Sequence, residues 1–226
     1  MRGPSSPQVL DPVGSRHEVR SCAPPPRSAA ACPVVTGAVF LETERLRLRC
    51  FTADDVDLLV ALDADPEVMF FITGGAPTPR EEIETEVLPA FLAYHARSAG
   101  TGFWALERRV DGAFLGWVHY RPLPDAPADE PELGYRLVRS AWGEGYAAEA
   151  SRAVIDHGIR TLGVRRVVAS TMAVNGASRR VMEKAGMRLV REFHADWPVR
   201  IPGDELGDVE YAITRDEWLA QGGARD

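Results

Sequence analysis

Long apolar runs, cysteines and an excess of positive charge are all scarce in this sequence. No stretch of its 226 residues approaches the roughly 20 apolar residues that cross a bilayer, so we expect no membrane partner. The three cysteines, Cys22, Cys32 and Cys50, have no metal-ligand spacing and suggest no disulfide framework. We therefore predict no metal and a reducing, cytoplasmic location. The net charge of −7 argues against nucleic acid as the main partner and suits cationic substrates such as amines.

The first 38 residues differ in composition from the rest of the chain. They hold seven of the 17 prolines and show no helical or strand periodicity, which predicts a disordered extension. Four arginines against two acidic residues would also fit a targeting peptide, but the apolar segment of such a peptide is missing. Residues 39–226 are numerous enough to bury one sizeable core, so we predict a single domain there.

The segment from Glu132 to Ala150 carries the strongest local signal. It is typical of a strand, then a turn containing Gly143 and Gly145, then the start of a helix. At such a turn, the unpaired N–H groups of the first helical turn and the positive end of the helix dipole point to the same place. The helix that follows has an apolar face of Ala147, Ala150, Val154, Ile155, Ile159 and Leu162. The pattern predicts a seat for the pyrophosphate of a cofactor.

The six residues from Gly143 to Ala148 also satisfy the loose fingerprint of dinucleotide-binding folds. That fingerprint requires an acidic residue at the end of the second strand, whereas the strand at 166–171 ends in hydroxyls. Upstream, residues 102–108 and 113–120 flank Asp111 and Gly112, which predicts an antiparallel hairpin. Antiparallel strands that lead into one βαβ element predict an α+β fold.

With these features the chain resembles the GNAT superfamily of acyl-CoA-dependent N-acetyltransferases, and within it the RimJ/RimL-like branch, from about Leu41 to Leu219. The resemblance is carried by residues 43–49, 132–137, 142–147 and 175–187. It implies a mixed, mostly antiparallel sheet of about six to seven strands, flanked by helices, with a central βα element for acetyl-CoA. Trp142 departs from the Gln or Arg with which the superfamily's loop usually begins, but the backbone amides of the loop are unaffected.

The other elements follow from capping and breaking residues. Arg45 to Arg49 is predicted to form a first strand, Thr52 to cap a helix that reaches Asp63, and Pro79 to begin a helix that reaches about Ala99. Later elements are a strand at 166–171, a helix at 176–185 ended by Gly186, strands at 187–193 and 208–213, and a short terminal helix. The loop at 194–207 is expected to form a wall of the acceptor site.

The resemblance implies acetyl-CoA as acyl donor, an amine as acceptor, and a monomer or homodimer. The positions that match its motifs are predicted to contact the cofactor: Leu137, Val138, Trp142, Gly143, Glu144, Gly145, Tyr146, Ala147, Asn175 and Ser178.

Glu132 is the predicted general base. Strand alternation places it on one face with Gly134 and Arg136, a few residues before the phosphate loop. In the resembled branch a glutamate here is a frequent proposal for the base, often acting through a water. The alternative is a structural ion pair with Arg136.

Asn175 and Ser178 form a second group of candidate residues. Asn175 is a natural N-cap for the helix that follows, and the resemblance implies that it also faces the pantetheine arm. Many members of the superfamily have a tyrosine seven residues after this asparagine, and it serves as the acid that protonates the thiolate. This chain has Met182 at that position. Ser178 is therefore the catalytic candidate that holds or protonates the leaving sulfur, with an ordinary first-turn serine as the alternative. His119 is a weaker candidate for the acceptor side.

The acceptor follows from the energy needed to neutralise an amine. Deprotonating a protein α-amine, which has a pKa of about 7.7–8.0, costs only about 1 kcal/mol at pH 7. Deprotonating a lysine-like amine, with a pKa of about 10.4, costs nearly 5 kcal/mol. One carboxylate suits the easier task, which favours a protein N-terminal α-amine. A small-molecule amine such as an aminoglycoside, or a non-catalytic acyl-CoA sensor, remains an open alternative.

Overall fold

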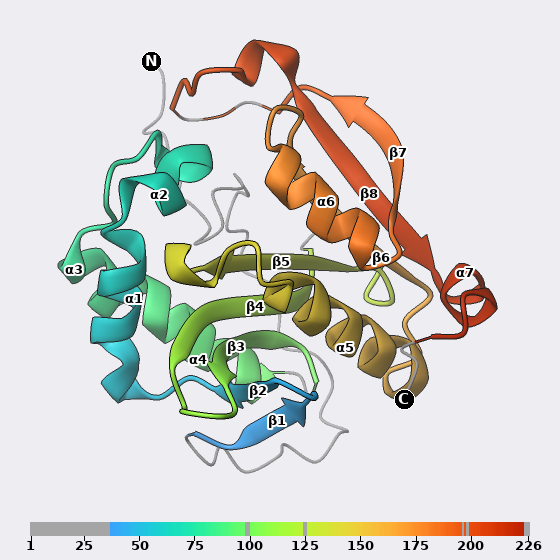
Figure 1. Cartoon of the computed structure of the whole chain (residues 1–226), viewed down its shortest axis with the longest axis horizontal. Coiled ribbons are helices and arrows are strands. Elements are labelled where there is room, and N and C mark those ends of the chain that lie inside the picture. The colour runs from blue at the N-terminus through green and yellow to red at the C-terminus, as the bar shows by residue number, and fades with distance from the viewer. Residues whose placement is uncertain (1–36, 98–99, 124–125, 196, 198, 224–226) are drawn as a thin grey trace, which may run out of the picture.

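Eight strands form one mixed sheet, shown in Figure 1 in a computed structural model that describes residues 37–97, 100–123, 126–195, 197 and 199–223. The strands are β1 (Val39–Glu42), β2 (Leu46–Cys50), β3 (Gly102–Arg108), β4 (Phe114–Pro122), β5 (Pro131–Leu137), β6 (Arg166–Met172), β7 (Arg188–Phe193) and β8 (Asp208–Thr214). Their order is β1-β2-β3-β4-β5-β6-β8-β7, and only β5 and β6 are parallel neighbours. The predicted α+β class is confirmed, with one strand more than expected because the four-residue β1 was not predicted.

Helices cover both faces of this sheet. They are α1 (Val56–Asp63), α2 (Pro66–Thr73), α3 (Arg80–Glu82), α4 (Leu88–Arg97), α5 (Tyr146–Thr161), α6 (Gly176–Lys184) and α7 (Arg215–Ala220). Short turns of helix are η1 (Ala53–Asp55), η2 (Ile83–Val87), η3 (Arg139–Ala141) and η4 (Asp204–Leu206). The helix predicted from Pro79 is present as α3, a π-helical η2 and α4, and its predicted end at Ala99 lies outside the described residues. The predicted disordered extension also lies outside them, except for residues 37 and 38.

Two apolar clusters pack on opposite faces of the sheet. Successive residues of β3 alternate between them, with Phe103 in the cluster of α1 and α4 and Trp104 in the cluster of α5. Both residues are buried, as expected for a sheet covered on each side. In α5 the predicted apolar face is confirmed, since Val154, Ile155 and Ile159 are at most 1% exposed. The sheet is therefore held rigid where β4 and β5 support the site.

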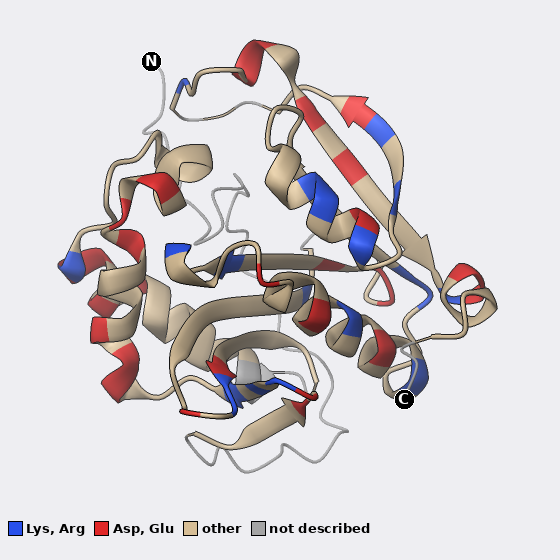
Figure 2. Cartoon of the chain, viewed as in Figure 1, with Lys and Arg blue, Asp and Glu red and all other residues tan. Residues whose placement is uncertain are grey.

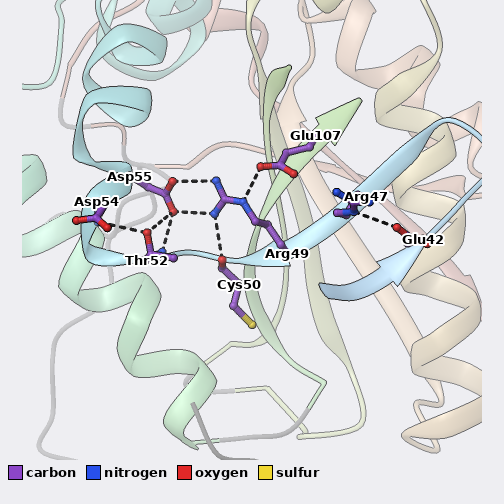
Figure 3. Close-up of polar contacts among 8 residues, drawn as sticks. All are labelled: Glu42, Arg47, Arg49, Cys50, Thr52, Asp54, Asp55 and Glu107. Carbon is purple, nitrogen blue, oxygen red and sulfur yellow. Dashed lines mark hydrogen bonds and ion pairs between the residues drawn. The ribbon is translucent and has the colours of Figure 1, made fainter. Parts of the chain in front are cut away.

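A buried ion-pair network joins β2 to the start of α1. Arg49 of β2 binds both carboxylate oxygens of Asp55 at 2.7 and 2.8 Å, and its Nε donates to Glu107 of β3 at 2.6 Å (Figure 3). Asp55 also accepts from the backbone N–H of Thr52, which caps the helical turn as predicted. Burial alone would raise the pKa of Asp55, but the bonds from Arg49 and Thr52 hold it below its ordinary value.

The parallel neighbours β5 and β6 pair at one point, where Glu132 lies opposite Val168. Beyond it the two strands diverge, and α6 lies beside the opening (Figure 1). Tyr135 of β5 reaches Ser178 of α6 across this gap, with its hydroxyl 3.0 Å from the Ser178 carbonyl oxygen. The divergence opens the sheet at its centre and leaves room for the site described next.

Candidate active site

A cavity of about 750 Å³ opens where β5 and β6 separate. Its walls come from β5, the turn before α5, the first turns of α5 and α6, the end of β6, and α2. The volume is in the range of cavities that hold cofactor-sized ligands. The cavity reaches both faces of the sheet, because the side chains of Tyr135 and Arg136, which are neighbours on β5 and point to opposite faces, both line it.

The turn before α5 has the geometry predicted for a phosphate seat. Gly143 and Gly145 have φ values of 81° and 82°, a region that favours glycine. A Cβ at Gly143 would meet no atom within 4 Å, so its side faces open space. No side chain caps α5, whose N-cap is Gly145, and the first N–H groups of a helix have no partner within it. These amides are available to an anion, as the fold of a phosphate-binding turn requires.

A clamp from the turn between β1 and β2 holds this loop, and it was not predicted from the sequence. Arg45 donates to the Glu144 carbonyl oxygen at 3.1 Å and to Glu149 of α5 at 2.7 Å, and its guanidinium lies 4.7 Å from the centre of the Tyr146 ring. Thr43 also donates to Glu149 at 2.5 Å. Burial alone would raise the pKa of Glu149, but these bonds hold it below its usual value. The clamp therefore fixes the loop before any ligand binds.

Most of the predicted cofactor residues lie together. The cavity is lined by Leu137, Trp142, Gly143, Gly145, Tyr146, Ala147, Asn175 and Ser178. Val138 and Glu144 are not part of its wall. Trp142 is half-exposed, and its indole N–H donates to the Leu137 carbonyl oxygen at 2.9 Å, which closes the turn.

Asn175 and Ser178 meet at the start of α6. The Asn175 side chain accepts from the Ser178 N–H at 3.1 Å, so the predicted N-cap is confirmed. The Ser178 hydroxyl lies 3.1 Å from the Tyr135 hydroxyl. Met182, one turn further along α6, is 2% exposed and lines the same cavity with an apolar side chain. Two hydroxyls therefore stand together on this wall.

Glu132 lies beside the cavity without lining it. One of its carboxylate oxygens is 3.3 Å from Arg121 and 3.5 Å from the buried ring of His119. Gly134, two residues along the same face of β5, does line the cavity. The His119 ring fills the space above Gly134, since a Cβ there would collide with His119 Cε1, so this ring stands between the carboxylate and Gly134.

Glu132 does not form the ion pair with Arg136 that was the alternative to its role as a base. Arg136 pairs with Asp63 of α1 at 2.6 Å, and both side chains are buried. Positions four apart on a strand are separated by about 13 Å, so sharing a face does not bring Glu132 and Arg136 together. The prediction of an ion pair between them was therefore wrong, and Arg121 is the arginine that faces Glu132.

Aromatic side chains also line the cavity. Phe70 and Phe71 of α2, Trp117 of β4 and Trp197 line it. Trp197 belongs to the loop predicted to form an acceptor wall, and its indole N–H donates to the buried Asp208 at 3.1 Å. Helix α2 was not predicted, although Asp65 caps it and Pro66 occupies its first position.

Charge is distributed unevenly around the cavity. Figure 2 shows basic residues along α6 and acidic residues along α1. Arg180 and Lys184 of α6 line the cavity. Glu67 is the one acidic residue among the described lining residues, and it is paired with Arg139 at 2.5 Å. The cavity therefore suits an anionic ligand beside α6.

The described part of the chain has neither a metal-binding cluster nor a membrane-spanning helix. No group of three or more His, Cys, Asp or Glu side chains within it has an arrangement that could hold a metal ion. None of its helices combines the length and apolar character required to cross a bilayer.

Known proteins match both the sequence and the fold. Residues 45–188 match the family described as acetyltransferase (GNAT) domain. A protein of Aspergillus fumigatus named FsC-acetyl coenzyme A-N(2)-transacetylase is 34% identical over 185 residues, which cover 79% of this chain and 77% of that protein.

Solved structures share the fold at lower identity. An aminoglycoside acetyltransferase in complex with coenzyme A is 16% identical, with a TM-score of 0.62 over 78% of this chain and 99% of that one. RimJ of Mycobacterium smegmatis in complex with CoA-disulfide is 19% identical, with a TM-score of 0.59 over 79% of this chain and 90% of that one. At these identities the likeness shows the fold, and the fold alone leaves the acceptor open.

Proposed function

This chain belongs to the GNAT family and is an acetyl-CoA-dependent N-acetyltransferase, and we propose that its acceptor is a primary α-amine, above all the N-terminal amine of a protein. The proposal places it with the RimJ/RimL-like enzymes. The observation that carries it is the scarcity of acidic side chains in the cavity wall, where Glu67 alone is acidic among the described residues and is already paired with Arg139.

Acetyl-CoA fits the end of the cavity at the phosphate turn. The amides that follow Gly143 and Gly145 would hold its pyrophosphate, and Arg180 and Lys184 would face its phosphates. The groove between β5 and Asn175 would hold the pantetheine arm. When bound, acetyl-CoA supplies an activated thioester.

The aromatic wall of the cavity then receives the acceptor. An aminoglycoside carries several ammonium groups, and binding it would require carboxylates that this wall does not provide. A peptide N-terminus brings a single reactive amine with apolar neighbours, which Phe70, Phe71 and Trp197 suit. Cation contact with an aromatic face would contribute about 0.5–1 kcal/mol.

Two residues would assist the transfer. Glu132 would accept the ammonium proton through a relay that includes the His119 ring, 3.5 Å from its carboxylate. An α-amine needs only about 1 kcal/mol to deprotonate at neutral pH. Ser178 would face the sulfur that leaves. Arg121, 3.3 Å from the Glu132 carboxylate, would hold it in place.

A small-molecule amine is the second candidate. It is supported by the fungal relative, whose name states that it acetylates an N2 position. The aromatic wall would accommodate such a molecule if its charge were low.

A panel of amines separates these acceptors. Release of the free CoA thiol is measured with a peptide that has a free N-terminus, the same peptide with that end blocked, an aminoglycoside and a small α-amino compound. We expect release with the free peptide and none with the blocked one. Release with the small compounds alone would contradict the protein acceptor, and binding of acetyl-CoA without release for any amine would identify a sensor.

A further inference from the structure

Tyr135 and Ser178 form a pair of hydroxyls on one wall of the cavity, although they come from different elements. Tyr135 belongs to β5 and Ser178 to the first turn of α6, and their hydroxyl oxygens are 3.1 Å apart. The Tyr135 hydroxyl also donates to the Ser178 carbonyl oxygen at 3.0 Å. Ser178 is further held through its N–H by the Asn175 side chain. The pair is therefore fixed on three sides before any ligand binds.

The geometry of this pair determines which hydroxyl donates in each hydrogen bond. A tyrosine hydroxyl has one proton, and the carbonyl oxygen of Ser178 takes it. The Ser178 hydroxyl must then donate to the Tyr135 oxygen, and its own proton is the one that can rotate toward the cavity. Burial raises the pKa of Tyr135, so this residue keeps its proton throughout neutral pH. Tyr135 is suited to holding Ser178 rather than to releasing a proton.

We propose that Tyr135 is a positioning residue that holds the Ser178 hydroxyl at the point where the sulfur of the acyl donor leaves. This inference rests on the proposed function. In the transfer, a C–N bond forms as the C–S bond breaks, the C–S electron pair goes to sulfur and the amine loses a proton. Ser178 meets the new negative charge on sulfur by turning its O–H toward it, while Tyr135 remains bonded to the Ser178 carbonyl oxygen.

The strand geometry explains why this tyrosine can reach α6. Beyond the pairing of Glu132 with Val168, β5 has no β6 neighbour in register, and Tyr135 is three residues further on. Its ring crosses the gap that a paired strand would fill. Met182 on the same wall of the cavity has no proton to donate, whereas Ser178, one turn earlier in α6, carries the hydroxyl that Tyr135 reaches.

The test compares binding of CoA with binding of dethio-CoA, in which hydrogen replaces the thiol. We expect the wild-type protein to bind CoA more tightly, because only CoA carries the sulfur that Ser178 contacts. Tyr135→Phe and Ser178→Ala should each reduce this preference by about fivefold to tenfold. Together they should reduce it no further, because they act on one contact. Calorimetry gives both dissociation constants without an acceptor.

Tyr120→Phe is the matched control. Tyr120 lies on the neighbouring strand β4, and its buried hydroxyl has no hydrogen-bond partner among the described residues. This variant should keep the preference for CoA. Tyr135→Phe should also lower kcat while leaving the KM for acetyl-CoA unchanged.

Two results would overturn the inference: a wild-type protein that binds both ligands equally, or a Tyr135→Phe variant that weakens both by the same factor. The latter would show that Tyr135 only packs α6 against β5. Because binding is read without an amine, absence of turnover with every amine would count against the proposed function alone.

Discussion

At the scale of single residues, Gly145 tests the proposed phosphate seat. Its φ of 82° is costly for any other residue, and a Cβ there would lie 3.6 Å from Arg45 Nη2, so a valine would disturb the contact that holds the loop and its amides. We expect Gly145→Val to abolish measurable acetyl-CoA binding while the protein still folds. Calorimetry and circular dichroism test the two halves of this expectation.

Gly112 provides the control for that variant. It has a φ of 70° in the turn between β3 and β4, and a Cβ there would meet no atom within 4 Å. Gly112→Val should carry the same backbone cost of about 1–2 kcal/mol and keep full affinity for acetyl-CoA. If a folded Gly145→Val protein bound acetyl-CoA normally, the seat would lie elsewhere.

Glu132→Gln tests the proposed base. An amine is mostly protonated below its own pKa and needs the base there, whereas above that pKa it loses the proton unaided. We expect turnover to fall about a hundredfold at low pH and the defect to shrink as the pH rises through the pKa of the acceptor. Affinity for acetyl-CoA should change little. The measurement is kcat across a pH series.

Arg121 complicates this variant, because removing one partner of a buried ion pair costs about 3–5 kcal/mol. The double variant Arg121→Met and Glu132→Gln removes both charges and serves as the control. If the double variant regains stability but its turnover at low pH stays low, the result would support Glu132 as the base. Turnover that is unchanged at every pH would leave the proximity of amine and thioester as the main source of rate.

At the scale of elements, the network around Arg49 joins β2, β3 and the start of α1. The pKa of Asp55 is below its ordinary value in the folded protein, so its contribution is complete above a pH of about 3.9 and is lost as the pH falls through the folded pKa. We expect Asp55→Asn to lower the free energy of unfolding by about 3 kcal/mol at neutral pH and by much less in strong acid. Urea denaturation at both pH values measures this.

The ion pair of Glu42, also drawn in Figure 3, provides an exposed control for the pair of Arg49 and Asp55. This pair with Arg47 is 3.0 Å long, but both side chains are about 40% exposed. Glu42→Gln should change the free energy of unfolding by at most about 1 kcal/mol at any pH. An equal loss in the two variants would contradict the role given to the buried network.

The sequence predicted the elements whose signals are local. Thr52 and Asn175 were identified as N-caps because capping depends on a few neighbouring residues, and the glycine turn before α5 was found for the same reason. Helix α2 was missed although Asp65 and Pro66 mark its start, because its apolar residues face both the core and the cavity and show little periodicity.

Contacts between distant segments could not be read from the sequence. Arg45 and Glu149 are 104 positions apart, and nothing in either neighbourhood indicates the other. The same limit explains the wrong partner given to Arg136, since Asp63 approaches it only through the packing of α1 on the sheet. Charge complementarity names the type of partner, and the fold selects which one.

At the scale of the whole molecule, the extension before β1 is proposed to be separate from the working domain. Its proline-rich composition lacks the apolar pattern needed to dock on the sheet. We expect deletion of residues 1–36 to change neither the Tm nor the turnover number. Residues 37 and 38 are kept because the Ala38 carbonyl oxygen accepts a hydrogen bond from Cys50. A clear loss of either property would make the extension part of the domain.

The choice of acceptor is tested most directly by competition within one molecule. A peptide with a free N-terminal α-amine and one internal lysine is incubated with the full chain and acetyl-CoA, and fragment mass spectrometry locates the acetyl group. Because the α-amine is easier to deprotonate by about 3.5 kcal/mol, we predict acetylation at the N-terminus and an unmodified lysine. Acetylation confined to the lysine, or of neither amine, would contradict the account.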